Sequence, residues 1–477
     1  MDVFISDILL NAPFAIVVLT TLVVLVLEST RGTRPNISSW TSIGGLSLAA
    51  CAALSNMGAS AETFGGMLQS GGIADYYDAL FCVAAVLTIL FSRNYFERQN
   101  YHRGEAYILI LFASLGMMVI AAANDLIMIF LGIELMSICL YVLAGLFRHR
   151  DRSNEASLKY FLLGAFATGF LLYGIALIYG STGSTNITLI RNAFPRISHD
   201  LLFLTGSGLL LAGFAFKIAA VPFHMWTPDV YEGSPTPISG FMSTGAKAAA
   251  FAALITVFSR VFGPSENPLH QIIALIAAAS MIAGNVIALA QSNIKRLLAY
   301  SSVAHAGYML VGLAAGTADG QIGVMYYLAV YALMNLGAFG IIGALEMEND
   351  QNLMLEDYAG LSERQPLLAA CMAVFLFGLA GVPPLAGFFG KYYVFLAAVK
   401  AHYVWLAIIG VLASLISAYY YLRIIVIMYF EKSKAEPAPV AVPMSVRWTV
   451  IFCAALVLLF GLFPSVIVQT ALRVFLF

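Results

Sequence analysis

The stretch from Phe216 to Lys247, FKIAAVPFHMWTPDVYEGSPTPISGFMSTGAK, decides how this sequence folds. Its surroundings are apolar enough to cross a membrane, but four prolines fall within positions 222–237. Proline removes a backbone hydrogen bond and clashes with the preceding turn, so no continuous helix passes through such a cluster. The stretch also carries Lys217 and Lys247 among apolar neighbours. We therefore predict a membrane helix that is broken and accompanied by buried charge.

A second stretch, GLAGVPPLAGFFGK at 378–391, has the same design. Four glycines and two prolines surround an abrupt break, and Lys391 follows it. The two Val-Pro pairs, at 221–222 and 382–383, are 161 residues apart with about five spans between them. Because an odd number of spans inverts the second unit, this pattern is typical of inverted-repeat transporters, whose broken helices place charge near the membrane midplane.

The composition indicates a membrane protein. Hydrophobic residues make up 61% of the 477 positions and charged residues only 10%, whereas soluble domains carry about 25% charged residues. The apolar runs are continuous rather than alternating, which favours helices over barrel strands. With about 20 residues per span, the sequence predicts an all-α polytopic protein of about 14 transmembrane helices. They centre near residues 18, 48, 82, 114, 136, 168, 211, 250, 280, 307, 334, 376, 415 and 458.

The spans suggest a division of the chain. We expect a three-helix segment at 1–104, a first five-helix repeat at 105–262 (spans 4–8), an inverted second repeat at 263–430 (spans 9–13), and a loop with span 14 at 431–477. Residues 1–27 lack the basic start and cleavage site of a signal peptide, so we interpret them as the first span. Lys and Arg gather in odd-numbered loops, which predicts that both termini lie on the non-cytoplasmic side.

Five basic residues lie within or at the edge of predicted spans. They are Lys159, Lys217, Lys247, Lys391 and Arg423. A lysine at a span centre costs about 2.5 to 3.5 kcal/mol, so a functional role is the default interpretation. Lys159 and Arg423 are close enough to span ends to reach the headgroups instead, which leaves a surface role open for both.

One acidic residue, Glu134, falls near mid-membrane, about nine residues past Asp125. Opposite charges about 4 Å apart attract by roughly 4 kcal/mol at an effective dielectric near 20, so a buried lysine beside it forms a natural proton-handling pair. A static ion pair that fixes helix packing is the alternative. The acids of the second half cluster in a predicted loop, which leaves Lys391 without an obvious partner. They are Glu346, Glu348, Asp350, Glu356, Asp357 and Glu363.

Two histidines are candidate stepping stones for protons. His224 follows the first break, and His305 lies in the run LLAYSSVAHAGYML. Histidine titrates near neutral pH and both donates and accepts, which suits a relay. The alternative for each is a core histidine bonded to a neighbouring helix. The five cysteines are scattered singly, without the spacing of a metal site or iron–sulfur cluster, and the net charge of −1 with no basic arm argues against nucleic acid.

Three runs carry a resemblance to a known family. The stretches at 216–247, 292–310 and 378–391 resemble the antiporter-like subunits of respiratory complex I, and HMWTPDVYEG with Lys391 most resembles the N subunits of the bacterial proton-pumping NADH:quinone oxidoreductase. The resemblance implies that Glu134 and Lys217 form a charge pair. It also implies that Lys247 is a central relay lysine and Lys391 the exchange lysine of a second half-channel. Lys159 falls near a sixth-span lysine of the family.

The resemblance further implies a translocase subunit of the bacterial inner membrane without a redox site of its own. FMN, iron–sulfur clusters and quinone would belong to partner subunits. The expected partners are the antiporter-like M subunit, small helical membrane subunits, lipids and, indirectly, the peripheral redox arm. Two alternatives stay open: a subunit of a multi-subunit sodium/proton antiporter, and a passive structural membrane subunit.

Overall fold

The computed structural model describes residues 2–31, 35–58, 60–259, 261, 268–347, 351–432 and 441–476. Within these ranges, 12 helices are long and apolar enough to cross a membrane. They are α2 (Ala12–Arg31), α3 (Pro35–Asn56), α4 (Gly72–Arg98), α5 (Glu105–Ala122), α6 (Leu126–Ala144), α7 (Asp151–Thr182), the composite helix at 236–259, α14 (Pro268–Leu289), α15 (Ile294–Ala314), α16 (Ala318–Leu345), α20 (Val404–Phe430) and α21 (Met444–Leu462).

The composite helix contains two π-helical turns. It consists of α11 (Thr236–Phe241), η2 (Met242–Ala246), α12 (Lys247–Leu254) and η3 (Ile255–Ser259). The π-helical turn η2 ends directly before Lys247, and such bulges occur frequently at functional sites. The remaining helices are shorter. They are α1 (Asp2–Leu10), α8 (Ile187–Ile197), α9 (Leu201–Lys217), α10 (Trp226–Gly233), α17 (Leu361–Arg364), α18 (Pro366–Ala380), α19 (Ala386–Lys400) and α22 (Ser465–Leu476), with 3-10 turns η1 (Phe64–Gly66) and η5 (Leu355–Tyr358).

Both predicted helix breaks are present. Helix α9 ends at Lys217 and α10 begins at Trp226, while α18 ends at Ala380 and α19 begins at Ala386. The two predicted spans near residues 211 and 376 are therefore interrupted helices, shorter than the other 12. The lysines differ in position, because Lys217 closes the helix before the first break and Lys391 lies in the second turn after the second break.

Two features depart from the sequence interpretation. A two-stranded antiparallel hairpin, β1 (Ser60–Thr63) and β2 (Leu68–Gly71), lies in a chain predicted to be all helical. The predicted first span at 1–27 is divided at Asn11, whose side chain donates to Thr63 of the hairpin at 3.0 Å. A polar bond thus separates α1 from the membrane-length helix α2. The predicted repeat boundary at 262/263 lies outside the described residues.

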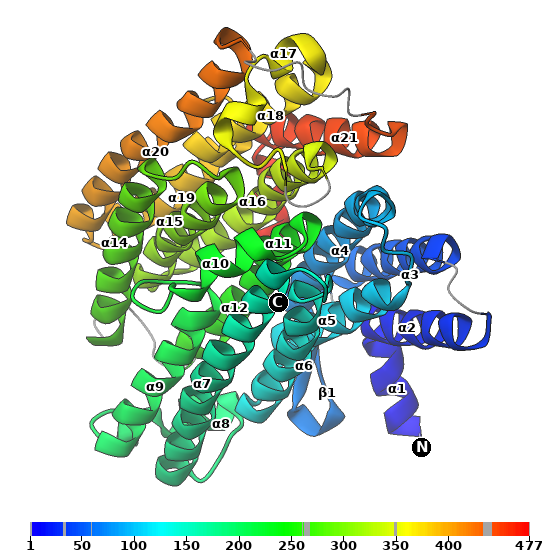
Figure 1. The fold of residues 1–477 in the computed structure, drawn as a ribbon. Coiled ribbons are helices and arrows are strands. Elements are labelled where there is room, and N and C mark those ends of the chain that lie inside the picture. Colours follow the sequence, from blue (N-terminus) through cyan, green and yellow to red (C-terminus); the bar gives the residue numbers. More distant parts are fainter. Residues whose placement is uncertain are drawn as a thin grey trace.

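The centre of the molecule is formed by α15, α16 and the composite helix. These helices are almost wholly buried, whereas α2, α7 and α20 expose many large apolar side chains, as expected for helices that face lipid. Figure 1 shows α2 and α3 on one flank and α14 and α20 on the opposite flank, with the central helices between them. Charged side chains on the central helices are therefore shielded from lipid by the chain itself.

The odd-numbered loops meet at one end of the molecule, which we call the odd-loop end. Arg98, at the end of α4, donates to the carbonyl of Ala344 at 2.8 Å, and Asn293, before α15, forms a β-bridge with Met354. These contacts join the loops after spans 3, 9 and 11.

The even-numbered loops meet at the opposite, even-loop end. The side chains of Asn124 and Asn186, which lie before α6 and α8, both donate to the carbonyl of Gly66 in the hairpin, each at 3.2 Å. The contacts thus connect loops of like parity, as alternating spans require.

Candidate functional site: a buried series of lysines

Lys217 is held by the hydroxyls of α6. It is buried, and its Nζ donates to Ser137 Oγ at 2.8 Å and to Tyr141 Oη at 3.5 Å. Nζ also lies 5.8 Å from the centre of the Tyr141 ring. Glu134, Ser137 and Tyr141 are spaced i, i+3, i+7, so they share one face of α6. The structure therefore places Lys217 against the face that carries the predicted acid.

The direct ion pair implied for Glu134 and Lys217 is not formed. Among the ion pairs of the described residues, none within 4.0 Å joins these two side chains. The Glu134 carboxylate is half-buried and acts on the Lys217 charge from a longer distance. Ser137, one helical turn away, provides the direct contact instead. The arrangement is a carboxylate, a hydroxyl and an ammonium group rather than a closed salt bridge.

Lys247 lies at the centre of the molecule, with only 2% of its surface exposed. Its Nζ donates to the backbone carbonyl of Ser302 in α15 at 2.6 Å. A dipole is a weaker partner for an ammonium group than a carboxylate. Among the residues that the structure describes, no carboxylate forms an ion pair with Lys247, so a polar contact holds this lysine.

His305 lies one turn beyond Ser302 on α15 and is also buried. Its Nδ1 lies 2.8 Å from Tyr327 Oη of α16, and its Nε2 lies 3.1 Å from Tyr421 Oη of α20. A neutral imidazole donates from one nitrogen and accepts at the other, so one tyrosine accepts and the other donates. Lys247 and Lys391 both act electrostatically on the ring. His305 therefore lies near enough to both lysines to be affected by their charges, while its hydrogen bonds go to the two tyrosines.

Lys391 is held by the second break. Its Nζ donates to the carbonyl of Ala380, the last residue of α18, at 2.9 Å and lies 4.7 Å from the centre of the Tyr308 ring. Gly381 follows in a left-handed conformation (φ +88), and a Cβ there would lie 3.0 Å from Lys391 Cδ. Glycine is thus required both for the backbone angle and for the space that the lysine occupies.

These contacts follow one face of α15. Ser302, His305 and Tyr308 are spaced three residues apart, so they lie along one side of the helix. Their contacts are, in order, Lys247, the two tyrosine hydroxyls and Lys391. The structure thus brings three of the seven predicted site residues into one series, and Lys217 with Glu134 forms a second group.

An open groove between α19 and α20 reaches Lys391 from the outer surface. It has a volume of about 660 Å³, and nearly all of its lining is apolar, including Phe388, Phe395 and Leu412. Lys391 is therefore covered by apolar side chains on the side of this groove rather than by acidic groups.

Lys159 lies outside the buried series. It is 40% exposed and pairs with Glu155 at 2.7 Å and with Asp229 of α10 at 2.6 Å, while Arg296 also contacts Asp229 at 2.7 Å. Partial burial raises the pKa of Asp229, but hydrogen bonds from Lys159 and Arg296 outweigh this effect and hold the pKa below its usual value. These residues form a surface network that fastens the broken helix to its neighbours. Arg423 is exposed on α20.

His224 lies between α9 and α10 and is buried. Within the described part of the chain, its Nδ1 makes no hydrogen bond, and the contacts found for the lysines do not include it. The structure therefore does not connect His224 to the series.

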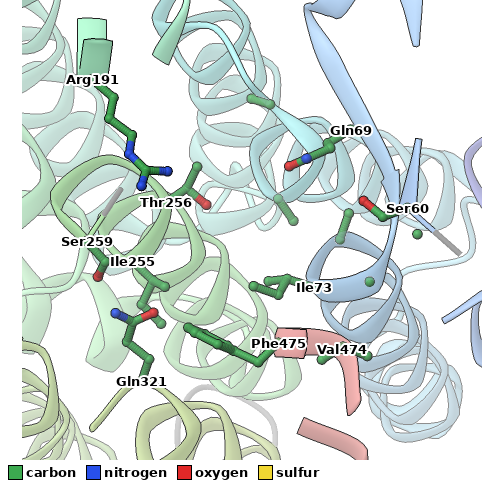
Figure 2. Close-up of a pocket in the computed structure, with 15 residues that line it drawn as sticks. Ser60, Gln69, Ile73, Arg191, Ile255, Thr256, Ser259, Gln321, Val474 and Phe475 are labelled. Carbon is green, nitrogen blue, oxygen red and sulfur yellow. The ribbon is translucent and has the colours of Figure 1, made fainter. Parts of the chain in front are cut away.

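A polar cavity lies toward the even-loop end of the composite helix. Its volume is about 410 Å³, and Figure 2 shows Gln69, Arg191, Thr256 and Gln321 around it, on separate elements. Thr256 is nine residues beyond Lys247 on the same helix, which corresponds to about 13 Å along the axis. Because a water molecule occupies about 30 Å³ of liquid, the cavity has room for several water molecules.

Several residues of the site were not predicted. Ser137, Tyr141, Tyr308, Tyr327 and Tyr421 make the contacts that hold the lysines and His305. The spacing of Ser137 and Tyr141 from Glu134 is a signal that could have identified these two. Among the acids expected in a loop of the second half, Glu346 does follow the last residue of α16, but it is completely buried. Glu348 and Asp350 lie outside the described residues.

Comparisons with known proteins agree with this geometry. A family model described as "NADH:quinone oxidoreductase/Mrp antiporter, TM" matches residues 123–417, which include both breaks and the three buried lysines Lys217, Lys247 and Lys391. The chain belongs to this family. Among curated members of the NADH:quinone oxidoreductase/Mrp antiporter family, the NADH-quinone oxidoreductase subunit N of Trichlorobacter lovleyi is 49% identical over 435 residues, 91% of this chain and 89% of that protein. The subunit N of Rhodospirillum rubrum is 47% identical over 426 residues, 88% and 87% of the two chains.

Solved structures have the same fold. A chain of respiratory complex I from Thermus thermophilus, solved with bound aureothin, superposes with a TM-score of 0.82 at 36% identity over 96% of this chain and 98% of that chain. A chain of the Mrp complex from Dietzia superposes with a TM-score of 0.87 over 98% and 97% of the two chains, but at 20% identity, so it shows the fold alone.

Proposed function

We propose that this chain is a proton-translocating N subunit of a bacterial NADH:quinone oxidoreductase. The observation that carries the proposal is the series Lys247, His305 and Lys391, held inside the membrane by carbonyls, hydroxyls and an aromatic face. Such partners cost less than leaving the groups unpaired, but they do not neutralise charge, so the proton stays exchangeable. The relatives named subunit N favour this function over the antiporter alternative.

The redox chemistry takes place in partner subunits that hold FMN, iron–sulfur clusters and quinone. The change that it drives alters the distance between Glu134 and Lys217, with Ser137 as the intervening hydroxyl. A proton released from Lys217 passes to Lys247, then through His305 to Lys391. Moving one charge against the membrane potential costs about 2.3 kcal/mol per 100 mV, which is comparable with the interaction of one buried charge pair.

The membrane setting follows from the same function. The chain spans the bacterial inner membrane many times, with the odd-loop end in the cytoplasm and both termini on the periplasmic side, because Lys and Arg gather in the odd loops. The repeats at 105–262 and 263–430 form two half-channels. The antiporter-like M subunit and small helical subunits pack beside them.

The test uses a complete complex that contains this chain in inverted membrane vesicles. Lys217→Ala and Lys391→Ala should each leave the complex assembled and abolish most NADH-driven proton uptake, because alanine holds no proton. Unchanged uptake in both variants would support the passive structural role and overturn the proposal. Sodium-dependent proton exchange without NADH would support the antiporter alternative.

A further inference from the structure

A buried carboxylate at the odd-loop end is not used by the relay described above. Glu346 is 0% exposed and directly follows α16. Its Oε1 accepts a hydrogen bond from Tyr95 Oη of α4 at 2.9 Å, and its Oε2 accepts one from Thr236 Oγ1, the first residue of α11. One carboxylate therefore joins α16 to two other helices, and one of these leads to Lys247.

Glu346 lies just beneath the surface of the odd-loop end. The next residue, Met347, is partly exposed. Arg98 is also partly exposed, donates to the carbonyls of Gly343 and Ala344, and acts electrostatically on Glu346. A proton from solvent thus has only a short distance to travel to this carboxylate. After the carboxylic acid releases its proton, the Arg98 guanidinium stabilises the ionised carboxylate.

Polar side chains continue from Glu346 toward the centre of the membrane. Ser92 lies one turn below Tyr95 on α4, and Ser239 and Ser243 lie three and seven residues beyond Thr236 on α11 and η2. All three serines are completely buried. The hydroxyl of Ser239 donates to the carbonyl of Tyr231 in α10, so it faces a different helix. We call the residues Ser92, Tyr95, Thr236, Ser243, Asn335 and Glu346, which lie on α4, on α11 with η2, and at α16, the polar seam.

The polar seam ends at the relay. Asn335 Nδ2 donates to Ser243 Oγ at 2.6 Å and to Tyr331 Oη at 3.0 Å. The Tyr331 ring packs on the ring of His305 with a centroid distance of 5.0 Å. Ser243 lies in the π-helical turn that directly precedes Lys247. The inner end of the seam therefore lies next to both central groups of the relay.

Two atoms within the seam require further hydrogen-bond partners. Ser92 Oγ and Asn335 Oδ1 are buried and make no hydrogen bond with any residue that the structure describes. A buried polar atom without a partner costs about 1 to 3 kcal/mol, and such atoms in native proteins usually bind water. Both atoms lie between the carboxylate and the relay, so water bound there would bridge the hydroxyls that are a helical turn apart.

We infer that Glu346 takes up protons at the odd-loop end and that the polar seam delivers them to Lys247 and His305. This inference rests on the proposed function. The carboxylate binds a proton from bulk water and becomes a neutral carboxylic acid, which then gives the proton to the adjoining hydroxyl or water. Each following hydroxyl or water accepts one proton and donates another, until one proton is bound at the relay. The carboxylate is then ionised again, and no other reactant is consumed.

The test compares three forms of residue 346 in the complete complex. Glu346→Gln keeps the size and an acceptor oxygen for one of the two contacts, while its amide NH2 faces the other hydroxyl, and it binds no proton. NADH-driven proton uptake should therefore fall about a hundredfold, at the low end of effects seen for proton-transfer groups. Glu346→Asp keeps a carboxylate but alters both contacts, so it should retain more uptake than Glu346→Gln. The opposite order, with Gln better than Asp, would show a structural role and overturn the inference. Glu363→Gln, an exposed change on α17, is the matched control.

A second variant covers the possibility that the changes at 346 prevent assembly. Asn335→Leu interrupts the seam without removing a charge, and it should also lower proton uptake while assembly is retained. Unchanged uptake in this variant would overturn the inference. Lys247→Ala separates the two proposals: if it leaves uptake intact, the proposed function fails. If it stops uptake while Glu346→Gln does not, only the inference about Glu346 fails.

Discussion

Replacement of Lys247 by methionine separates a functional lysine from a structural one. Methionine has nearly the same length and no charge. The change relieves the cost of holding a lysine at the centre of a membrane, which is about 2.5 to 3.5 kcal/mol. It also removes one charged hydrogen bond, to the Ser302 carbonyl at 2.6 Å, which stabilises the protein by about 1.5 to 3 kcal/mol. The Ser302 carbonyl keeps a partner, because it lies inside α15, where backbone bonds continue. The net change in stability therefore ranges from a loss of about 0.5 kcal/mol to a gain of about 2 kcal/mol.

We therefore expect the stability of Lys247→Met to be close to or above that of the parent, with a melting temperature changed by a few degrees at most. We also expect this variant to lose NADH-driven proton uptake. The assay is thermal unfolding of the purified complex beside proton uptake in vesicles. Lys400→Met is the matched control, because Lys400 is exposed and pairs with Asp319 at 2.8 Å, a contact worth under about 1 kcal/mol. A destabilisation of more than about 3 kcal/mol in Lys247→Met, or retained proton uptake, would refute the reasoning.

Three further changes test other parts of the site. Gly381→Ala should destabilise the second break by about 1 to 2 kcal/mol, because its φ is left-handed, and should lower proton uptake by displacing Lys391; thermal unfolding and vesicle assays measure both effects. Ser137→Ala removes the hydroxyl that accepts a hydrogen bond from Lys217 at 2.8 Å. Because the loss of one hydrogen bond to a charged group costs at least about 1.4 kcal/mol, proton uptake should slow about tenfold. Asp229 has a lowered pKa in the folded protein. Its ion pairs therefore stabilise the protein fully at pH values above the ordinary carboxyl pKa, and this stability is lost as the pH falls through the lower pKa of the folded state. Measurements of unfolding at a series of pH values should show this loss in the parent and not in Asp229→Asn.

The breaks and the buried lysines could be predicted because they depend on local chemistry. Prolines at 222–237 end a helix wherever it lies, and the cost of a charge in lipid requires that Lys217, Lys247 and Lys391 have polar contacts. The structure has both breaks within a few residues of the expected positions. The functional roles of these lysines stay predictions that the proposed experiments test.

The contacts of the lysines could not be predicted, because they come from helices far apart in the sequence. Tyr421 of α20, which bonds His305, is 116 residues away from it in the sequence, and Tyr327, the other partner, lies on α16. Glu346 lies just after α16, as its place between an apolar run and other acids predicted, but its burial was not predicted. It is buried because α4 and α11 pack over the end of α16, which is a tertiary effect that hydropathy along the chain does not contain.

The two lysines beside the breaks have different electrostatic surroundings, and this difference suggests a direction. Lys217 lies in the field of Glu134 on the same chain, so movement of that carboxylate changes how tightly the lysine holds its proton. Lys391 is held only by the Ala380 carbonyl and the Tyr308 face among the contacts described, and an apolar groove adjoins it. Dipoles stabilise a positive charge less than a nearby anion does, so the surroundings of Lys391 favour a positive charge less than those of Lys217. In the proposed relay, transfer of a proton from Lys217 toward Lys391 therefore requires that the Glu134 carboxylate first move away from Lys217, because its departure weakens the hold of that lysine on the proton.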